Sequence, residues 1–244
     1  MTGGCEVVEL RRYRLRPGRR ETLIELFERE LIEPQEAAGM WVIGQFRDGD
    51  EPDQFVWLRG FPDMDRRAAA LATFYGGPVW ARHKDAANAT MINSDNVLLL
   101  RPASPGAGFG ASAAPRAPAG AGGEGGGLIV ATVCHLAPRT EGDFAAFFAA
   151  AVRPQLAAAG AEVRAAFIPE RASNTFPRLP VREGETVFAW FSAFRDRPAY
   201  DAHLGALERS AAWRTDIAPE LDRREWRRNE VSLLSPTSRS HLQY

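Results

Sequence analysis

The chain has 244 residues, of which 45% are hydrophobic and 25% are charged, a composition typical of a globular protein with a buried core. Its 30 Lys and Arg residues nearly balance its 31 Asp and Glu residues, so no excess of positive charge is available to bind nucleic acid. Two cysteines are too few for the disulfide framework of a small secreted domain, and the N-terminus lacks the apolar core of a signal peptide. No apolar run approaches the ~18 residues of a membrane span. We therefore expect a cytoplasmic protein without nucleic-acid or membrane partners.

The segment 103–127 consists almost entirely of Ala, Gly, Pro and Ser. Such a composition cannot bury enough apolar surface to offset the entropy lost on ordering. We interpret this segment as a disordered linker. It separates a first unit at 5–102 from a second unit at 128–236, which is followed by a tail at 237–244.

The two units repeat one pattern. Their residues align at a shift of about 121, which becomes 133 past a longer loop in the second unit. The larger shift pairs Trp57 with Trp190 and Trp80 with Trp213, and chance would rarely keep two Trp pairs in one register. The chain is therefore predicted to be a tandem duplication.

Each unit contains the same predicted succession of elements. A strand is followed by a helix with apolar residues at helical spacing, by a hairpin of two strands, by a second helical region and by a last strand. The strands are expected at 7–15, 40–47, 54–61 and 97–100 in the first unit, and at 128–136, 161–168, 186–194 and 231–234 in the second. The first helix is expected to end near Pro34 or Pro154, and Gly76-Gly77-Pro78 divides the second helical region of the first unit. This order, βαββαβ, is that of a ferredoxin-like unit.

Both faces of the predicted sheets carry apolar residues. Val56 and Leu58 alternate with Phe55, Trp57 and Phe61, so neither face has the polar pattern of a solvated sheet. The helices of such a unit cover only one face, and the second unit supplies the cover for the other. We predict an α+β fold in which two ferredoxin-like βαββαβ units are fused, sheet to sheet, into a pseudo-dimeric α/β barrel. A further homodimer of this barrel is left open.

Several segments of the first unit have a family-like pattern, namely VVELRRYRLRPGRRETLIELFE, PQEAAGMWVIGQF, QFVWLRGF and PVWARH. Together they resemble the NIPSNAP family of the dimeric α/β-barrel superfamily over about residues 7–102. The second unit, with AVRPQLAAAGAEVRAAF and VFAWFSAFRDRP, resembles the same domain more loosely. The resemblance implies the fold. It implies no single reaction, because the superfamily includes cofactor-free monooxygenases, haem-dependent enzymes, lactone isomerases and polyketide cyclases.

Polar residues on otherwise buried strands are the first candidates for chemistry. No metal-spaced His and Cys set, phosphate loop or nucleophile elbow is visible, so neither a metal nor a cofactor is expected. Glu9, Arg11, Tyr13 and Arg59 are such residues, and buried charges are seldom kept unless paired. If they share a face with Trp57, they form a polar cluster inside an aromatic wall, as a site for an oxygenated aromatic ligand requires. An internal salt bridge explains them equally well.

The second helical regions carry the other candidates. His83 and His203 lie on the helical stripe that is expected to face the sheet. Three interpretations are open for each: a core imidazole bonded to a backbone carbonyl, an acid/base group, or a haem ligand. The Trp residues that repeat between the units, including Trp80, either fill the core or line an aromatic pocket.

We predict a small-molecule enzyme of secondary metabolism, acting on a hydrophobic aromatic or polyketide-like substrate by acid/base or cofactor-free oxygenation or cyclisation chemistry. A cofactor-independent monooxygenase, a cyclase or an isomerase would fit. Tyr13 and His83 are the predicted proton-transfer groups, and Arg59 is predicted to stabilise an enolate or phenolate. The predicted substrate contacts are Glu9, Arg11, Trp57, Trp80, Trp190 and His203.

The site is expected mainly in the first unit. The second unit carries Val130, Thr132 and Cys134 where the first carries Glu9, Arg11 and Tyr13, so the two pockets would differ in their donors and acceptors. A non-catalytic ligand-binding or scaffolding protein and a haem-binding protein are the alternative interpretations.

Overall fold

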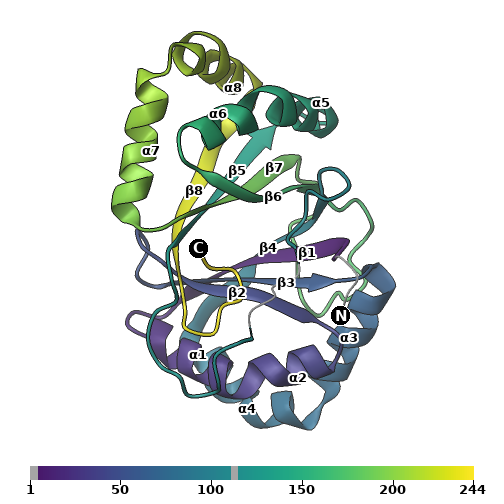
Figure 1. Ribbon diagram of the computed structural model, residues 1–244. Helices are drawn as coiled ribbons and strands as arrows, with labels where there is room; N and C mark the ends of the chain where they lie inside the picture. The colour runs from purple at the N-terminus through teal and green to yellow at the C-terminus, as the bar shows by residue number, and fades with distance from the viewer. Residues whose placement is uncertain (1–4, 111–114) are drawn as a thin grey trace.

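The computed structural model describes residues 5–110 and 115–244. Within these residues eight strands form a closed barrel, and two layers of helices cover it on opposite sides (Figure 1). The strands are β1 (Val7–Leu15), β2 (Trp41–Asp48), β3 (Gln54–Phe61), β4 (Met91–Pro102), β5 (Leu128–Leu136), β6 (Glu162–Pro169), β7 (Val187–Phe194) and β8 (Glu225–Pro236). The helices are α1 (Arg20–Leu26), α2 (Ile32–Ala37), α3 (Met64–Gly76), α4 (Pro78–Thr90), α5 (Glu141–Phe147), α6 (Arg153–Ala158), α7 (Arg197–Arg209) and α8 (Ala218–Arg224), with π-helical turns η1 (Phe27–Leu31), η2 (Phe148–Val152) and η3 (Trp213–Ile217).

The order of strands around the barrel is β1-β3-β2-β8-β5-β7-β6-β4. Each unit therefore contributes four adjacent strands, and the units join at two short antiparallel seams. At one seam β2 pairs with β8, with Phe46 opposite Pro236, and at the other β4 pairs with β6, with Leu100 opposite Pro169. This architecture confirms the predicted α+β fold of two ferredoxin-like units fused into one barrel.

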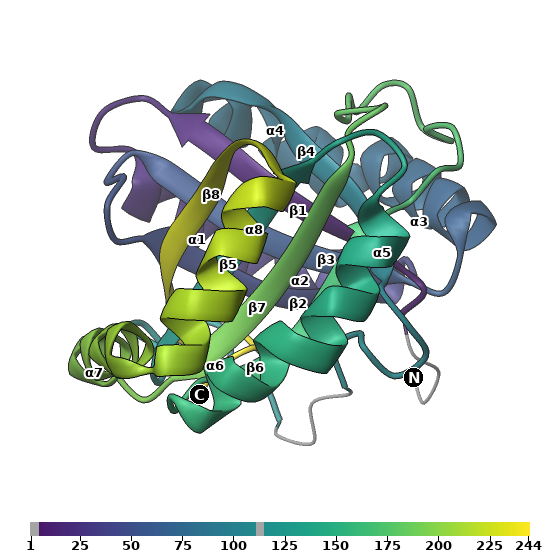
Figure 2. The ribbon, with the colours of Figure 1, turned by 90° about the horizontal axis from the view of Figure 1, so that it is seen from above.

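Alternation along the strands separates an inner core from two outer cores. Inward side chains of both units, such as Leu10, Leu58 and Phe191, form one apolar cluster inside the barrel. Outward side chains pack under the helices of their own unit in two further clusters. Figure 2 shows the helices of the second unit lying across the outer face of its strands. Because the barrel interior is filled, space for a ligand lies outside it, either in an open hollow of about 780 Å³ beside Trp41, Phe109 and Arg116 or between a sheet and its helices.

The first helix of each unit continues past the proline where it was predicted to end. Helix α2 contains Pro34 and ends at Ala37, and helix α6 contains Pro154 and ends at Ala158. A π-helical turn immediately precedes each of these helices, at Phe27–Leu31 and Phe148–Val152. The wider turn changes which carbonyl lies below the proline ring, so the steric clash that normally ends a helix is relieved.

The last strand of each unit is longer than predicted. Strand β4 begins at Met91, and its polar start reads as a turn in the sequence. Asn93 and Asn96 nevertheless pair with Arg14 and Arg12 of β1 across a bulge. Their side chains are half-buried or exposed, so pairing with β1 tolerates polar residues there.

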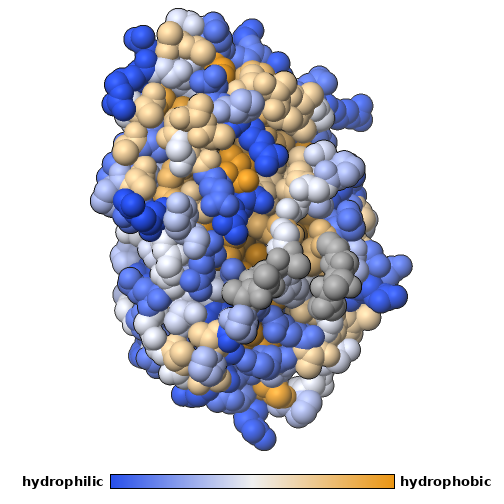
Figure 3. All heavy atoms as spheres, in the orientation of Figure 1, coloured by the Kyte–Doolittle hydropathy of each residue, from blue (hydrophilic) through white to orange (hydrophobic). Residues whose placement is uncertain are grey.

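The described residues of the segment between the units contact the barrel at several points. The Phe109 ring lies 5.1 Å from the rings of both Phe167 and Phe191 inside the barrel, and Arg116 donates to Glu36 and to the carbonyl of Val42. Figure 3 shows apolar atoms in the hollow between the two units on this side. The mobility of 103–127 and the domain bounds stay predictions, and residues 111–114 lie outside the described part of the chain.

The residues after β8 return to the first unit. The Leu242 amide donates to the carbonyl of Ile43, and the Thr237 amide donates to the carbonyl of Gln45. Arg239 is buried and pairs with Glu33 of α2. The C-terminal residues thereby run beside β2 and add contacts between the two units.

Candidate active site

The antiparallel register of β1 and β3 brings the predicted polar residues together. Glu9 lies opposite Arg59 and Arg11 lies opposite Trp57, all on the face that helices α1–α4 cover. Tyr13 is the next outward residue of β1 and packs edge-on against Trp57 at 6.0 Å. The sequence-predicted cluster of polar groups against an aromatic wall therefore exists in the first unit.

Glu9 is the centre of a fully buried ion cluster. Its Oε2 lies 2.6 Å from Arg11 Nη1 and 2.7 Å from Arg59 Nε, and its Oε1 lies 2.6 Å from Arg67 Nε. Burial alone would raise the pKa of Glu9, but the three guanidinium groups hold it well below its ordinary value. Three positive charges thus share one carboxylate, and the cluster carries an excess of positive charge.

The phenol of Tyr13 is arranged as a hydrogen-bond donor. Its oxygen accepts a hydrogen bond of 2.9 Å from Arg11 Nε, which leaves the phenolic proton free to be donated elsewhere. Burial raises the pKa of Tyr13 above its ordinary value, although the charge of Arg11 acts in the opposite direction. The phenol therefore stays protonated at neutral pH and suits donation to an oxyanion better than abstraction of a proton.

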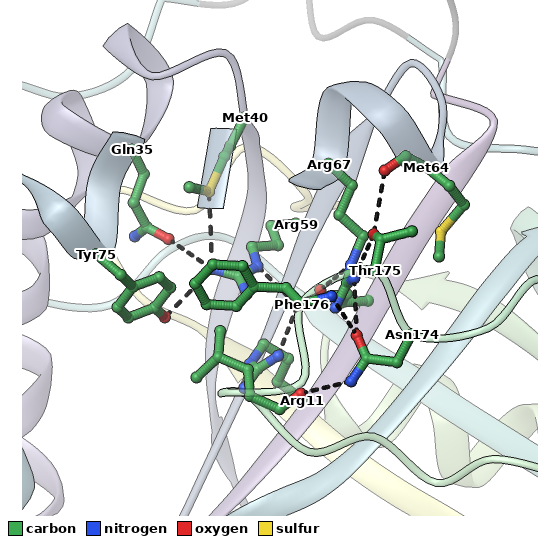
Figure 4. A network of polar contacts seen from close by, with 12 residues as sticks. Arg11, Gln35, Met40, Arg59, Met64, Arg67, Tyr75, Asn174, Thr175 and Phe176 are labelled. Carbon is green, nitrogen blue, oxygen red and sulfur yellow. Dashed lines mark hydrogen bonds and ion pairs between the residues drawn. The ribbon is translucent and has the colours of Figure 1, made fainter. Parts of the chain in front are cut away.

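Several buried N–H groups have no hydrogen-bond partner among the described residues. Those in or beside the ion cluster are Arg59 Nη2, Arg67 Nη2 and Trp57 Nε1. Arg59 Nη1, by contrast, lies 3.3 Å from Gln35 Oε1 and 3.4 Å from the Tyr75 hydroxyl (Figure 4). Unmet donors on buried cations are costly, and an anionic oxygen is the acceptor that they bind most strongly.

Aromatic side chains enclose a small cavity beside this cluster. Its volume is about 30 Å³, and its lining includes Tyr13, Trp57, Phe74, Tyr75 and Trp80. A cavity needs roughly 10–15 Å³ to hold one water molecule. The cavity is therefore large enough for water and too small for an aromatic ligand in this arrangement of the chain.

The loop between β6 and β7 of the second unit covers the cluster. This loop, residues 170–186, is the long counterpart of residues 49–53 in the first unit, and Figures 1 and 2 show it extending to the first unit near α3. Asn174 Oδ1 and Thr175 Oγ1 accept hydrogen bonds of 3.0 and 3.3 Å from Arg67 Nη1. The Phe176 ring stacks on Tyr75 at 5.9 Å (Figure 4).

Three predicted site residues lie apart from the cluster. His83 does not line the cavity, and its Nε2 lies 3.5 Å from Glu30 Oε2 on η1. Trp190 packs with Phe148 and Phe188 in the outer core of the second unit. His203 is in that unit as well, where its Nδ1 lies 3.1 Å from the Ala159 carbonyl and burial lowers its pKa.

The second unit lacks an equivalent cluster. The outward face of β5 carries Val130, Thr132 and Cys134, and Ser192 stands at the register position of Arg59. Burial raises the pKa of Cys134 to about 12, so its thiol stays protonated at neutral pH. The outer core of this unit is an ordinary apolar one.

Arg67, Tyr75 and the tip of the 170–186 loop were not predicted. Arg67 had a detectable signal, because it precedes Leu71 and Phe74 by four and seven residues on the buried stripe of α3. For the loop, the only signal in the sequence is that the shift between the repeats changes from 121 to 133. This change shows that the loop is longer in the second unit, but it does not show where the loop lies.

The described residues contain neither a candidate metal-binding group nor a candidate membrane-spanning helix. No group of three His, Cys, Asp or Glu side chains that could hold a metal ion occurs within residues 5–110 and 115–244. Over the same ranges, no helix combines the length and the apolar character needed to cross a membrane.

The first unit resembles a known protein family. The family model described as NIPSNAP matches residues 8–105. The first unit is thus similar to the NIPSNAP domain over less than half of the chain. The second unit lies beyond the match, in keeping with its divergent outer core. None of the curated proteins matches the chain.

Solved structures share the fold of the whole two-unit barrel. A putative monooxygenase from Fusobacterium nucleatum is 12% identical with a TM-score of 0.59, and the match covers 100% of this chain and 99% of that one. An anthrone oxidase-like protein is 14% identical with a TM-score of 0.59, covering 97% and 95%. A putative monooxygenase from Lactobacillus acidophilus is 11% identical with a TM-score of 0.58, covering 94% and 93%. At these identities the similarity shows the fold alone.

Proposed function

We propose that the first unit binds a hydrophobic aromatic or polyketide-like compound as its oxyanion and promotes its cofactor-free oxygenation or cyclisation. The observation that carries the proposal is the buried cluster in which three guanidinium groups share the carboxylate of Glu9 next to an aromatic cavity. Proteins that resemble this chain in fold are named after monooxygenase or anthrone oxidase activity, which agrees with this class of substrate.

The chemistry follows from where charge develops. An aromatic ketone that loses an α-proton becomes an enolate or phenolate, and a preorganised set of buried N–H and O–H donors stabilises that charge more than the neutral ketone. Arg59 and the phenolic proton of Tyr13 are the proposed donors. Glu9 is fully ion-paired and its pKa is low, so it holds the guanidinium groups in place and does not act as the base. His83 remains a proposed proton-transfer group, and His83→Ala tests that role.

Anthrone is a suitable test substrate because its enolate reacts with O2. Anthrone and one O2 give anthraquinone and one water, which balances all atoms without an added cofactor. The measurement is O2 uptake together with anthraquinone absorbance, each corrected for the spontaneous reaction. We expect the wild-type protein to accelerate both.

The repeat provides a matched pair of variants. Trp57 and Trp190 occupy equivalent outward positions, and both are buried. Trp57→Phe removes the unpartnered indole N–H beside the cluster and should lower the rate, whereas Trp190→Phe makes the same change in the second unit and should not. Equal effects of the two variants, or no acceleration by the wild type, would count against the proposed site.

The size of the cavity favours a second candidate function. A cavity of about 30 Å³ and a densely bonded ion cluster are also what a non-catalytic ligand-binding or scaffolding protein would show. Binding of an aromatic oxyanion measured by calorimetry, without turnover, would select this candidate over the enzyme.

A further inference from the structure

The tip of the 170–186 loop has the chemical character of the ligand proposed above. Phe176 places an aromatic ring on Tyr75, and the two residues before it place an amide oxygen and a hydroxyl oxygen on Arg67. A ring with oxygen acceptors close to it is also the outline of an aryl compound that carries an oxyanion. Figure 4 shows the ring and these oxygens side by side over the ion cluster.

The contacts of the loop suit a segment whose tip can be displaced while its ends stay in place. Its two ends are fixed to β4, where the Glu170 amide donates to the Leu99 carbonyl and the Arg182 amide donates to the Val97 carbonyl. Between these ends the bonds are mostly within the loop, as from the Phe176 amide to Asn174 Oδ1. Just over half of its side chains are exposed, and Phe176, Leu179 and Val181 are only partly buried against the outer core of the first unit. Segments with few fully buried contacts open at a lower cost in free energy than core elements do.

We propose that Asn174, Thr175 and Phe176 occupy the ligand-binding site in the absence of ligand, and that an incoming aryl oxyanion displaces them. The ligand ring would take the position of Phe176 on Tyr75, and its oxyanion would accept from Arg67 Nη1 in place of the loop oxygens. This inference rests on the proposed function of the first unit, and it defines the ligand as an aromatic ring with an anionic oxygen group directly attached. Displacement of the loop would free the space that Phe176 occupies on Tyr75, and Tyr75 also lines the cavity of about 30 Å³.

The test compares an anionic probe with its neutral counterpart. The probe is 1-hydroxy-2-naphthoate, and the control ligand is 1-hydroxy-2-naphthamide, which has the same shape without the carboxylate charge. Binding is measured by calorimetry on the full chain, together with hydrogen exchange of residues 170–186. We expect the carboxylate to bind more tightly than the amide. We also expect it to increase exchange at the Phe176 and Leu179 amides, because the displaced tip loses the contacts with Arg67 and Tyr75 that hold its internal bonds in place.

Phe176→Ala removes the ring that competes with the probe. We expect the carboxylate to bind this variant about 2- to 10-fold more tightly, the contribution of one aromatic pair. Ser173→Ala, an exposed neighbour on the same loop, should bind as the wild type does. Thr175→Val, which removes one oxygen from Arg67 and keeps the side-chain shape, gives an independent second variant with the same expected direction.

The outcomes separate the two proposals. Weaker or unchanged binding in both Phe176→Ala and Thr175→Val, or slower exchange of the loop on binding, overturns the displaced-loop inference and leaves the binding site intact. Absence of probe binding in the wild type and in both loop variants, all folded as judged by circular dichroism, overturns the proposed function itself.

Discussion

At the residue scale, the site depends on which protonation states the buried groups keep. Tyr13 is held as a neutral phenol whose oxygen is already bonded to Arg11. Tyr13→Phe keeps the ring and removes only the hydroxyl, so the fold should persist. Since loss of one oxyanion donor typically lowers turnover ~10²–10³-fold, we expect a decrease of that order in anthrone oxidation. His203→Ala, in the second unit, serves as the control and should change the rate far less.

Glu9 makes the stability of the first unit depend on pH. Its pKa is lowered in the folded chain, so it contributes stability above its ordinary pKa of 4.5, and this contribution is lost as the pH falls below that value. Glu9→Gln should therefore flatten the loss of stability between about pH 5 and pH 3. At pH 7 it should cost ~3–5 kcal/mol, because it leaves buried guanidinium groups without their carboxylate.

Urea unfolding of the wild type and the variant at several pH values measures this effect. Glu21→Gln is the control, since Glu21 pairs with Arg47 at a largely exposed position and such pairs contribute ~0–1 kcal/mol. A Glu9→Gln variant as stable as the wild type at pH 7 would show that the cluster does not need its carboxylate.

The residues of the cluster could be predicted only as far as strand alternation reaches. Period-two alternation places Glu9, Arg11 and Tyr13 on one face of β1, and the antiparallel hairpin order places Arg59 beside them. Arg67 depends on the rotation of α3 against the sheet, and the contact with Thr175 depends on where a long loop lies. Neither is encoded in local periodicity, so both were missed.

At the element scale, the segment between the units contributes to the core. Phe109 is 9% exposed and packs among the inward side chains of the second unit. Truncation of a core Phe to Ala typically costs ~3–5 kcal/mol, and we expect Phe109→Ala to lie near the lower end because the ring is close to the barrel opening. Chemical denaturation measures the difference. A cost below ~1 kcal/mol would mean that the ring is not held inside the barrel.

The helix bounds show a limit of prediction at this scale. Apolar spacing located the first helix of each unit correctly, and the helix ends three residues after Pro34 in the first unit and four residues after Pro154 in the second. The π-helical turns at Phe27–Leu31 and Phe148–Val152 shift the hydrogen-bond pattern by one residue, which hydrophobic spacing alone does not show. Their equal positions in the two units are a further mark of the duplication.

At the scale of the whole molecule, the two units should remain associated without their covalent connection. They share one apolar barrel interior, two strand seams and the C-terminal residues that run beside β2. Limited proteolysis is expected to cut within 103–127, and the fragments should elute together in size-exclusion chromatography. Fragments that separate and stay folded as monomers would contradict a shared core.

The long 170–186 loop breaks the symmetry between the two units. In a dimer of identical subunits every change of sequence appears twice, so a loop that reached across the two-fold axis would cover both sites alike. Fusion of the two units into one chain removes this coupling, and here only the second unit has the long form while residues 49–53 of the first stay short. One unit supplies the charged pocket and the other supplies its cover. The two units of this chain therefore correspond to two different subunits of a dimer, and the proposed site needs residues from both.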